Sequence, residues 1–192
     1  GYVGFIFGSV KANPWWGSVL MPIVFLMSAI VSGIAMVMFL YIILSLVRNE
    51  KLDMRCLDKV GLFLLVAIIV DFVLEALDYI HRIYQSEESI GILAELVSSK
   101  LFTSLVIVQL MLGMLLPLLI LVLVRIVRFN EDLRRLLYFT SSLLILVGIF
   151  SMRWNVVIGG QLFSKSFLGY TTYKLDFATR EGLLPAIIFM VL

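Results

Sequence analysis

Long apolar runs separated by short charged segments dominate the hydropathy pattern of this chain. Four runs have about the 20 residues that a helix needs to cross a bilayer. They predict membrane-spanning helices at 19–47, 60–84, 100–127 and 133–152. A fifth apolar run begins near Leu183, behind Arg180, and stops after about half that length. The pattern therefore predicts four complete spans and the start of a fifth.

Two of the connections between these runs are short and charged, at 48–59 and 128–135. Tight connections place consecutive helices side by side in opposite directions. The predicted fold is an all-α integral membrane protein, an antiparallel four-helix transmembrane bundle plus the start of a fifth helix. The expected organisation is an interfacial lead-in at 1–18, the bundle at 19–152, an outward-facing connection at 153–180 and the start of a further helix at 181–192.

Composition supports a membrane protein and excludes several other classes. The chain is 62% hydrophobic, with a mean hydropathy of +1.11 and only 15% charged residues, whereas soluble domains are about 45–50% apolar and 25% charged. The basic residues are scattered over loops, which argues against nucleic-acid binding. With one Cys and one His, the chain cannot supply the ligands of a bis-histidine haem or an iron–sulfur cluster. We expect no bound cofactor and no metal site.

The distribution of Lys and Arg predicts the orientation. Eight lie in or beside the connections 48–59 and 125–135, against seven on the other side. Two of those seven, Arg82 and Arg153, stand at predicted helix ends and are set aside as functional candidates. The positive-inside rule then predicts that 48–59 and 125–135 are cytoplasmic, in a multi-pass protein of the cell (inner) membrane.

One predicted span carries a row of ionisable residues. Asp71, Glu75, Asp78 and Arg82 follow at intervals of four, three and four residues, which places them on one helical face, with His81 beside them. Ionisable groups inside a bilayer are costly and typically face protein or water. Carboxyl groups shielded from water can bind and release protons near neutral pH. We interpret the row as a candidate proton path or the protonatable lining of a redox or transport site.

A purely structural interpretation of the same row stays open. Asp78 and Arg82 have the spacing of an ion pair within one helix. Asp71 and Glu75 would then be neutralised by polar groups on a facing helix, such as Gln109 or Ser104. Gln109 is the one amide deep inside its span, so it is a candidate both for this packing role and for the proton path.

A second unusual segment runs from Met152 to Gln161. Arg153 closes an apolar run and precedes Trp154, Asn155 and the pair Gly159-Gly160. Adjacent glycines allow unusual backbone conformations, so a re-entrant turn is expected here. In such a turn Arg153 would neutralise the carboxylates or bind an anionic or carbonyl ligand. The alternative, in which Arg153 is an interfacial residue whose side chain extends to the membrane surface, stays open.

The string from Arg153 to Phe167, RWNVVIGGQLFSKSF, resembles a late signature of the NrfD/polysulfide-reductase membrane subunits. It is most similar to the ten-helix branch that includes HybB-type hydrogenase subunits and DsrP subunits. The segments 169–174 and 13–16 also fit this branch. The resemblance covers most of the chain and implies that it is a C-terminal half, helices six to nine and the start of ten, of a longer protein.

The resemblance implies a function that composition does not. Members of this family carry no haem or metal and exchange electrons between menaquinone or ubiquinone and a ferredoxin-like iron–sulfur subunit, within a larger respiratory complex. The family's quinone pocket lies in an N-terminal bundle outside this chain, so no quinone ligands are assigned here. The connection 153–180 would face outward and meet the iron–sulfur partner. The candidate docking residues there are Trp154, Asn155, Gln161, Lys165 and Tyr170.

The alternative from another functional class is half of a proton- or cation-coupled membrane transporter that uses the same carboxylates as ion ligands. Such transporters commonly have broken helices around a site at mid-membrane, and only the Arg153 segment suggests a break. A passive anchor would leave the aligned ionisable residues without a purpose.

Overall fold

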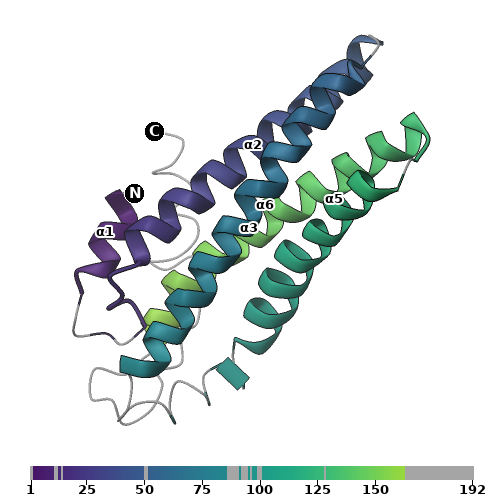
Figure 1. Cartoon of the computed structure of the whole chain (residues 1–192). Helices are drawn as coiled ribbons and strands as arrows, with labels where there is room; N and C mark the ends of the chain where they lie inside the picture. Colours follow the sequence, from purple (N-terminus) through teal and green to yellow (C-terminus); the bar gives the residue numbers. More distant parts are fainter. Residues whose placement is uncertain are drawn as a thin grey trace, which may run out of the picture.

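The computed structural model describes residues 2–10, 13, 15–49, 52–85, 91, 95, 97–98, 101–127 and 129–162, apart from the side chains at positions 82 and 85. The helices in order are α1 (Tyr2–Gly8), α2 (Met21–Arg48), α3 (Met54–Gln85), η1 (Phe102–Leu115), α5 (Leu116–Ile126) and α6 (Glu131–Leu162). Figure 1 shows α2, α3, α5 and α6 as long rods, with α1 beside the start of α2.

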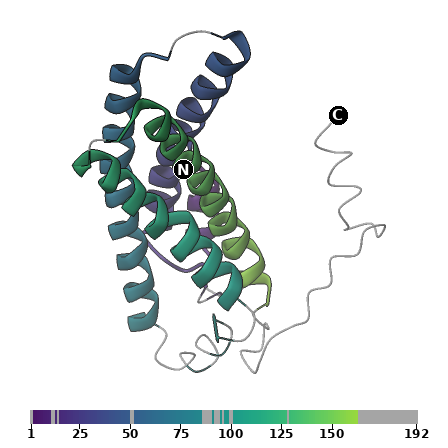
Figure 2. The same ribbon diagram turned by 90° about the vertical axis from the view of Figure 1, so that its right-hand side faces the viewer.

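The long helices form a bundle with alternating directions. α2 packs on α3 and on α6, while α6 also packs on η1 and α5, and α5 returns to α3. In the view of Figure 2 the four rods follow a common long axis. Within the described residues, four helices are long and apolar enough to cross a membrane: Met21–Arg48, Met54–His81, Phe102–Ile126 and Glu131–Leu162. This confirms the predicted all-α membrane architecture. The predicted fifth helix lies outside the described residues.

The two ends of the bundle, the loop end and the tryptophan end, are built from different segments. The loop end holds the α2–α3 and α5–α6 connections, where Asn49 ends α2 in the left-handed conformation (φ 55°) that asparagine tolerates well. The tryptophan end holds Trp15 and Trp16, the start of α2 and the last turns of α3 and α6.

Two predicted boundaries are wrong. α3 begins at Met54 rather than at 60. α6 does not end at 152 but runs through Arg153 and through Gly159-Gly160 to Leu162, so the expected re-entrant turn is absent from these residues and the connection begins later than 153. The glycines serve close packing instead, because a Cβ on Gly159 would lie 2.6 Å from the Trp15 indole nitrogen.

The third span has an unusual backbone. Residues Phe102–Leu115 form a π-helix, η1, before the α-helical α5. The amide of Leu116 still bonds the carbonyl of Met111, five residues back. Pro117 then has no amide hydrogen to donate, and the α-helical pattern begins. Extended π-helical pieces are rare and recur at functional sites.

Candidate functional site: a buried carboxylate and amide cluster

Three carboxyl groups of α3 face the inside of the bundle. The residues Asp71, Glu75 and Asp78 are 0%, 6% and 4% exposed. Their four- and three-residue intervals keep them on the inward face of α3, where Asp71 and Glu75 line a cavity with residues of α2, η1 and α6. The lipid-facing positions between them, such as Val73 and Leu77, are apolar and exposed. The sequence pattern thus placed these three groups correctly relative to the core.

Glu75 is held by an amide from η1. Gln109 Nε2 donates to Glu75 Oε2 at 3.0 Å and lies 3.5 Å from the hydroxyl oxygen of Tyr79. Gln109 is itself 5% exposed. The structural interpretation, in which Gln109 satisfies a carboxylate across the bundle, is therefore correct for Glu75.

The hydrogen-bonded chain continues from Gln109 into α6. Asn155 Nδ2 donates to Gln109 Oε1 at 2.9 Å, and Ser104 Oγ donates to Asn155 Oδ1. Ser151 Oγ donates to the carbonyl of Ser104 at 3.0 Å. Each amide thus uses its oxygen as acceptor and its nitrogen as donor, which fixes both amide orientations.

Asp71 differs from its neighbours because neither of its side-chain oxygens has a hydrogen-bond partner among the described residues. It lines a small cavity with Glu75 and Gln109, beside Gly113 and Gly148. The space open to the centre of a water molecule is about 10 Å³, which is room for about one water. A buried polar atom without a partner commonly indicates a water or a function.

Asp78 contacts a residue that sequence reasoning missed. Ser18 Oγ donates to Asp78 Oδ1, and the backbone amide of Leu20 donates to Ser18 Oγ at 3.2 Å. Ser18 is 1% exposed although it precedes the first span. A serine in a lead-in segment carries no sequence signal for burial, so only the fold reveals this contact.

The lead-in closes the cluster at the tryptophan end. The indoles of Trp15 and Trp16 donate to the carbonyls of Asn155 (3.1 Å) and Val156 (2.7 Å). Asn13 Nδ2 donates to the carbonyl of Gly160 at 2.8 Å. Trp15 is 2% exposed and packs inside the protein.

The other predicted site residues lie away from this cluster. The expectation that Arg153 neutralises the carboxylates is wrong, because its side chain is exposed and no ion pair joins the two among the described residues. His81 is half-buried, and its Nε2 has no hydrogen-bond partner in the described part of the chain. The side chain of Arg82 lies outside the described residues.

The predicted docking residues are of three kinds: exposed, buried, and outside the described residues. Trp154 is 43% exposed and Gln161 is also exposed, so both are accessible at the surface of α6. Asn155 is 1% exposed, so its assignment as a docking residue is wrong. Lys165 and Tyr170 lie outside the described residues.

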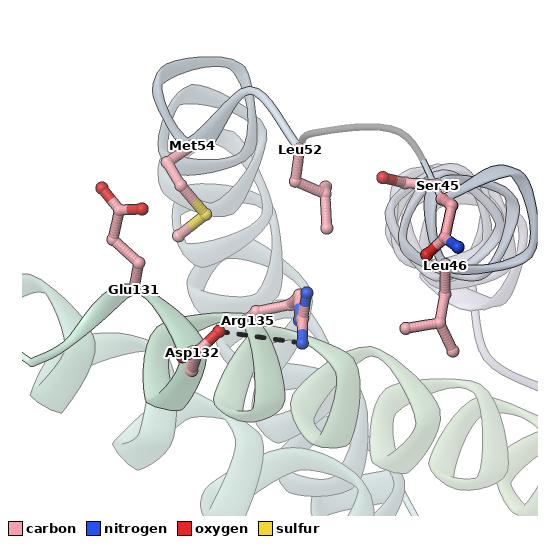
Figure 3. Close-up of a pocket in the computed structure, with 8 residues that line it drawn as sticks. Ser45, Leu46, Leu52, Met54, Glu131, Asp132 and Arg135 are labelled. Carbon is pink, nitrogen blue, oxygen red and sulfur yellow. Dashed lines mark ion pairs between the residues drawn. The ribbon is translucent and has the colours of Figure 1, made fainter.

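A separate polar region lies at the loop end. Arg134 forms an ion pair with Asp58, whose other carboxylate oxygen accepts a hydrogen bond from Tyr138 at 2.9 Å. Beside it, Ser45, Met54, Glu131 and Arg135 are among the lining residues of an open pocket of about 360 Å³. Figure 3 shows Arg135 turned toward Asp132 within this pocket. Across the described ranges, no three His, Cys, Asp or Glu side chains are placed to hold a metal ion.

Comparison with known proteins identifies the family. Residues 1–165 match the model described as Polysulphide reductase, NrfD. The chain belongs to the NrfD family. This confirms the resemblance inferred from the sequence at family level, while the ten-helix branch and the C-terminal position stay predictions. Family membership and four candidate spans make this NrfD chain a multi-pass membrane protein.

This NrfD chain is also similar to a subunit of the selenate reductase of Mesobacillus selenatarsenatis. The two are 29% identical over 160 residues, which cover 82% of this chain and 35% of the relative. The chain therefore spans about a third of the length of that protein. No solved structure matches the chain significantly.

Proposed function

We propose that this chain is part of a membrane subunit of a respiratory oxidoreductase complex that exchanges electrons between a quinone and a ferredoxin-like iron–sulfur subunit. In this proposal the subunit binds no cofactor, and quinone is its substrate. The buried carboxylates of α3 take up and release protons that accompany the redox reaction. Support comes from NrfD family membership and from a relative that is a reductase subunit.

The observation that carries the proton role is the environment of Asp71. It is fully buried, about midway along the bundle, with no hydrogen-bond partner in the described part of the chain. Structural carboxylates inside membranes are typically paired with a cation or with polar groups. A carboxyl group without such a partner adds nothing to packing that an apolar residue would not supply better. Reversible proton binding would explain why a carboxyl group is present at position 71.

Quinone chemistry makes such a group useful. Reduction of a quinone to a quinol takes up protons together with electrons, and quinol oxidation releases them. The reaction takes place within the bilayer, where water is scarce. Glu75 and Asp78 follow Asp71 along the same helix face toward the tryptophan end, so the three carboxyl groups can pass protons between mid-membrane and one surface.

The transporter alternative uses the same carboxylates as ion ligands, and a broken helix at Arg153 would have supported it. In such a helix a discontinuous segment would expose backbone groups to an ion. α6 is continuous from Glu131 to Leu162, so this segment offers no such site, and we do not propose a transporter.

The test uses the intact complex that contains this subunit, reconstituted in proteoliposomes with a pH-sensitive dye inside. Quinone turnover and internal pH are recorded for wild type and for Asp71→Asn combined with Glu75→Gln. Asp132→Asn is the matched control, because that residue has a 95% exposed side chain. We expect the double variant to lose the internal pH change and to turn quinone over more slowly, because the protons of the quinone reaction can no longer pass through the carboxylates.

Three other results would count against parts of the proposal. Wild-type complex that does not react with quinone would refute the assigned activity. A double variant with normal turnover and normal proton movement would refute the proton role. A double variant that does not assemble, beside an assembled Asp132→Asn complex, would make the carboxylates structural.

A further inference from the structure

The buried polar groups of α3 occupy only part of the membrane depth. From Asp71 toward the loop end, the next acidic residue of α3 is Asp58, thirteen positions back in the sequence, or about 20 Å along the helix axis. The buried positions between them are Gly61, Leu64, Ala67 and Ile68, none of which can carry a proton.

The other helices complete a water-excluding region at this depth, here called the apolar layer. It consists of Ala35, Met38, Leu64, Ile68, Met114 and Ile145, each at most 6% exposed and all in one packed cluster. Two buried hydroxyls of α6 toward the loop end, those of Ser141 and Ser142, donate to carbonyls of their own helix, those of Tyr138 and Phe139. They therefore do not bridge the layer.

In the opposite direction the polar groups follow one another closely. Asp71, Glu75 and Gln109 share the cavity that has room for about one water. Asp78 lies one turn beyond Glu75 and is bonded to Ser18, at the tryptophan end. Acidic side chains at intervals of about one turn, followed by the Ser18 hydroxyl, thus lie from the middle of the bundle toward the tryptophan end.

The amide chain is not an alternative exit from the cavity. Gln109 Nε2 donates to Glu75, and Gln109 Oε1 accepts from Asn155. A neutral amide has no ionisable proton to give up at either atom, so a proton on Glu75 cannot pass through Gln109 into α6. The chain instead holds the Glu75 carboxyl group in place beside the cavity.

We propose that the cluster is a one-sided proton well, in which Asp71 exchanges its proton only with the tryptophan end. One water in the cavity accepts the proton from Asp71 and gives one to Glu75, from which it passes to Asp78; the reverse sequence loads Asp71. The apolar layer blocks exchange with the loop end. This inference rests on the proposed function only in assuming that the cluster binds protons.

Few titratable side chains of the described residues face the cavity beside Asp71. In the described part of the chain, α2, η1 and α6 present no titratable side chain to the cavity, whose lining from those helices consists of Val31, Gln109, Gly113, Met114, Ile145, Gly148 and Ile149. Glu75 is the one other ionisable residue at the cavity wall, with Tyr79 and Asp78 within a turn of it.

The test measures on which side of the membrane the proton of Asp71 equilibrates. The intact complex is reconstituted in vesicles with a strongly buffered interior, and infrared difference spectra are recorded while only the external pH is changed. The Asp71 carboxyl band is identified as the one missing in Asp71→Asn. Labelling of Cys56, exposed at the loop end, with an impermeant thiol reagent gives the fraction of vesicles with that end outward.

We expect the Asp71 band to follow the external pH only in complexes with the tryptophan end outward. Above the pKa of the group the band should fall about tenfold for each pH unit. With the loop end outward the band should respond only after an ionophore equilibrates the interior. A band that follows the external pH in both orientations, or only with the loop end outward, overturns the proposal, as does the absence of any titrating Asp71 band.

A variant of the apolar layer provides a second measurement. Leu64→Ser places a hydroxyl in the layer, and Val66→Ser places one on the exposed face of the same helix. Leu64→Ser should make the band respond to loop-end pH at least tenfold faster than in Val66→Ser; equal responses would show that the layer is not the barrier. The infrared spectra are recorded without quinone turnover. The proton well can therefore be tested even if the proposed quinone reaction is refuted.

Discussion

Replacement of Gly148 by Ala tests the close approach of α6 and η1 that sets the width of the cavity. A Cβ on Gly148 would lie 2.9 Å from the carbonyl carbon and 3.0 Å from the carbonyl oxygen of Gly113. Carbon atoms in contact are ordinarily about 3.5–4.0 Å apart. Because the opposing atoms are backbone, with the Cα of Gly113 the nearest of them, no side chain can rotate away, and the two helices must separate by about 1 Å or more.

The cost follows from overpacking, which destabilises by about 1–3 kcal/mol. Part of this overpacking cost is offset in Gly148→Ala, because Ala has a higher helix propensity than Gly by about 1 kcal/mol. Gly33→Ala isolates that gain, since a Cβ on Gly33 has nothing within 4 Å. The difference between the two variants therefore reports overpacking alone.

The assay heats the purified complex in detergent to a series of temperatures. Size-exclusion chromatography then measures how much of this subunit remains folded at each temperature. Each kcal/mol corresponds to about 2–4 °C for a chain of this size, so Gly148→Ala should unfold at least about 2 °C below Gly33→Ala. A Gly148→Ala complex as stable as Gly33→Ala would refute the close contact of Gly113 with Gly148.

Two further predictions concern the ends of the bundle. Trp15→Phe removes the indole donor of the bond to the Asn155 carbonyl and should lower stability by about 1 kcal/mol, seen as a lower unfolding midpoint. Arg134→Gln removes the ion pair with Asp58, whose side chains are 23% and 29% exposed, and should cost about 1 kcal/mol or less. High salt should reduce that loss, which unfolding at two salt concentrations measures.

Each of these has a result that would contradict it. A Trp15→Phe midpoint equal to wild type would mean that the indole nitrogen contributes no net stability to the attachment of the lead-in. An Arg134→Gln effect that is unchanged or larger at high salt would show that the arginine acts through packing and not through its charge.

Periodicity in the sequence was sufficient to predict the spans and the inward face of α3. A charged side chain that faces lipid has a high free-energy cost. The intervals between Asp71, Glu75 and Asp78 therefore already indicated one helix face that is turned away from lipid. The same argument pointed to Gln109, the one amide deep in its span, as a partner. Its bond to Glu75 confirms this packing role.

The remaining parts of the site depend on contacts between distant segments. Asn155 bonds Gln109 across 46 positions, and Ser18 bonds Asp78 across 60; neither residue has a local pattern that reveals its partner. The Gly159-Gly160 pair suggested a break because glycine weakens helices. The indoles of Trp15 and Trp16, which pack against these glycines, reverse that expectation. Nothing in the local sequence distinguishes the π-helix η1 from an α-helix.

The apolar layer has an electrical consequence. The apolar part of α3 that contributes to it, between Asp58 and Asp71, extends about 20 Å along the helix axis, roughly two-thirds of the about 30 Å hydrocarbon thickness. Most of a membrane potential therefore falls across it, between Asp71 and the loop end. A proton that reaches Asp71 from the tryptophan end crosses only the remaining third of the potential, which at about 2.3 kcal/mol per charge per 100 mV corresponds to about 0.8 kcal/mol. A voltage of about 100 mV would then shift the occupancy of Asp71 by only about half a pH unit, so that loading of the site follows the pH at the tryptophan end more than the membrane voltage.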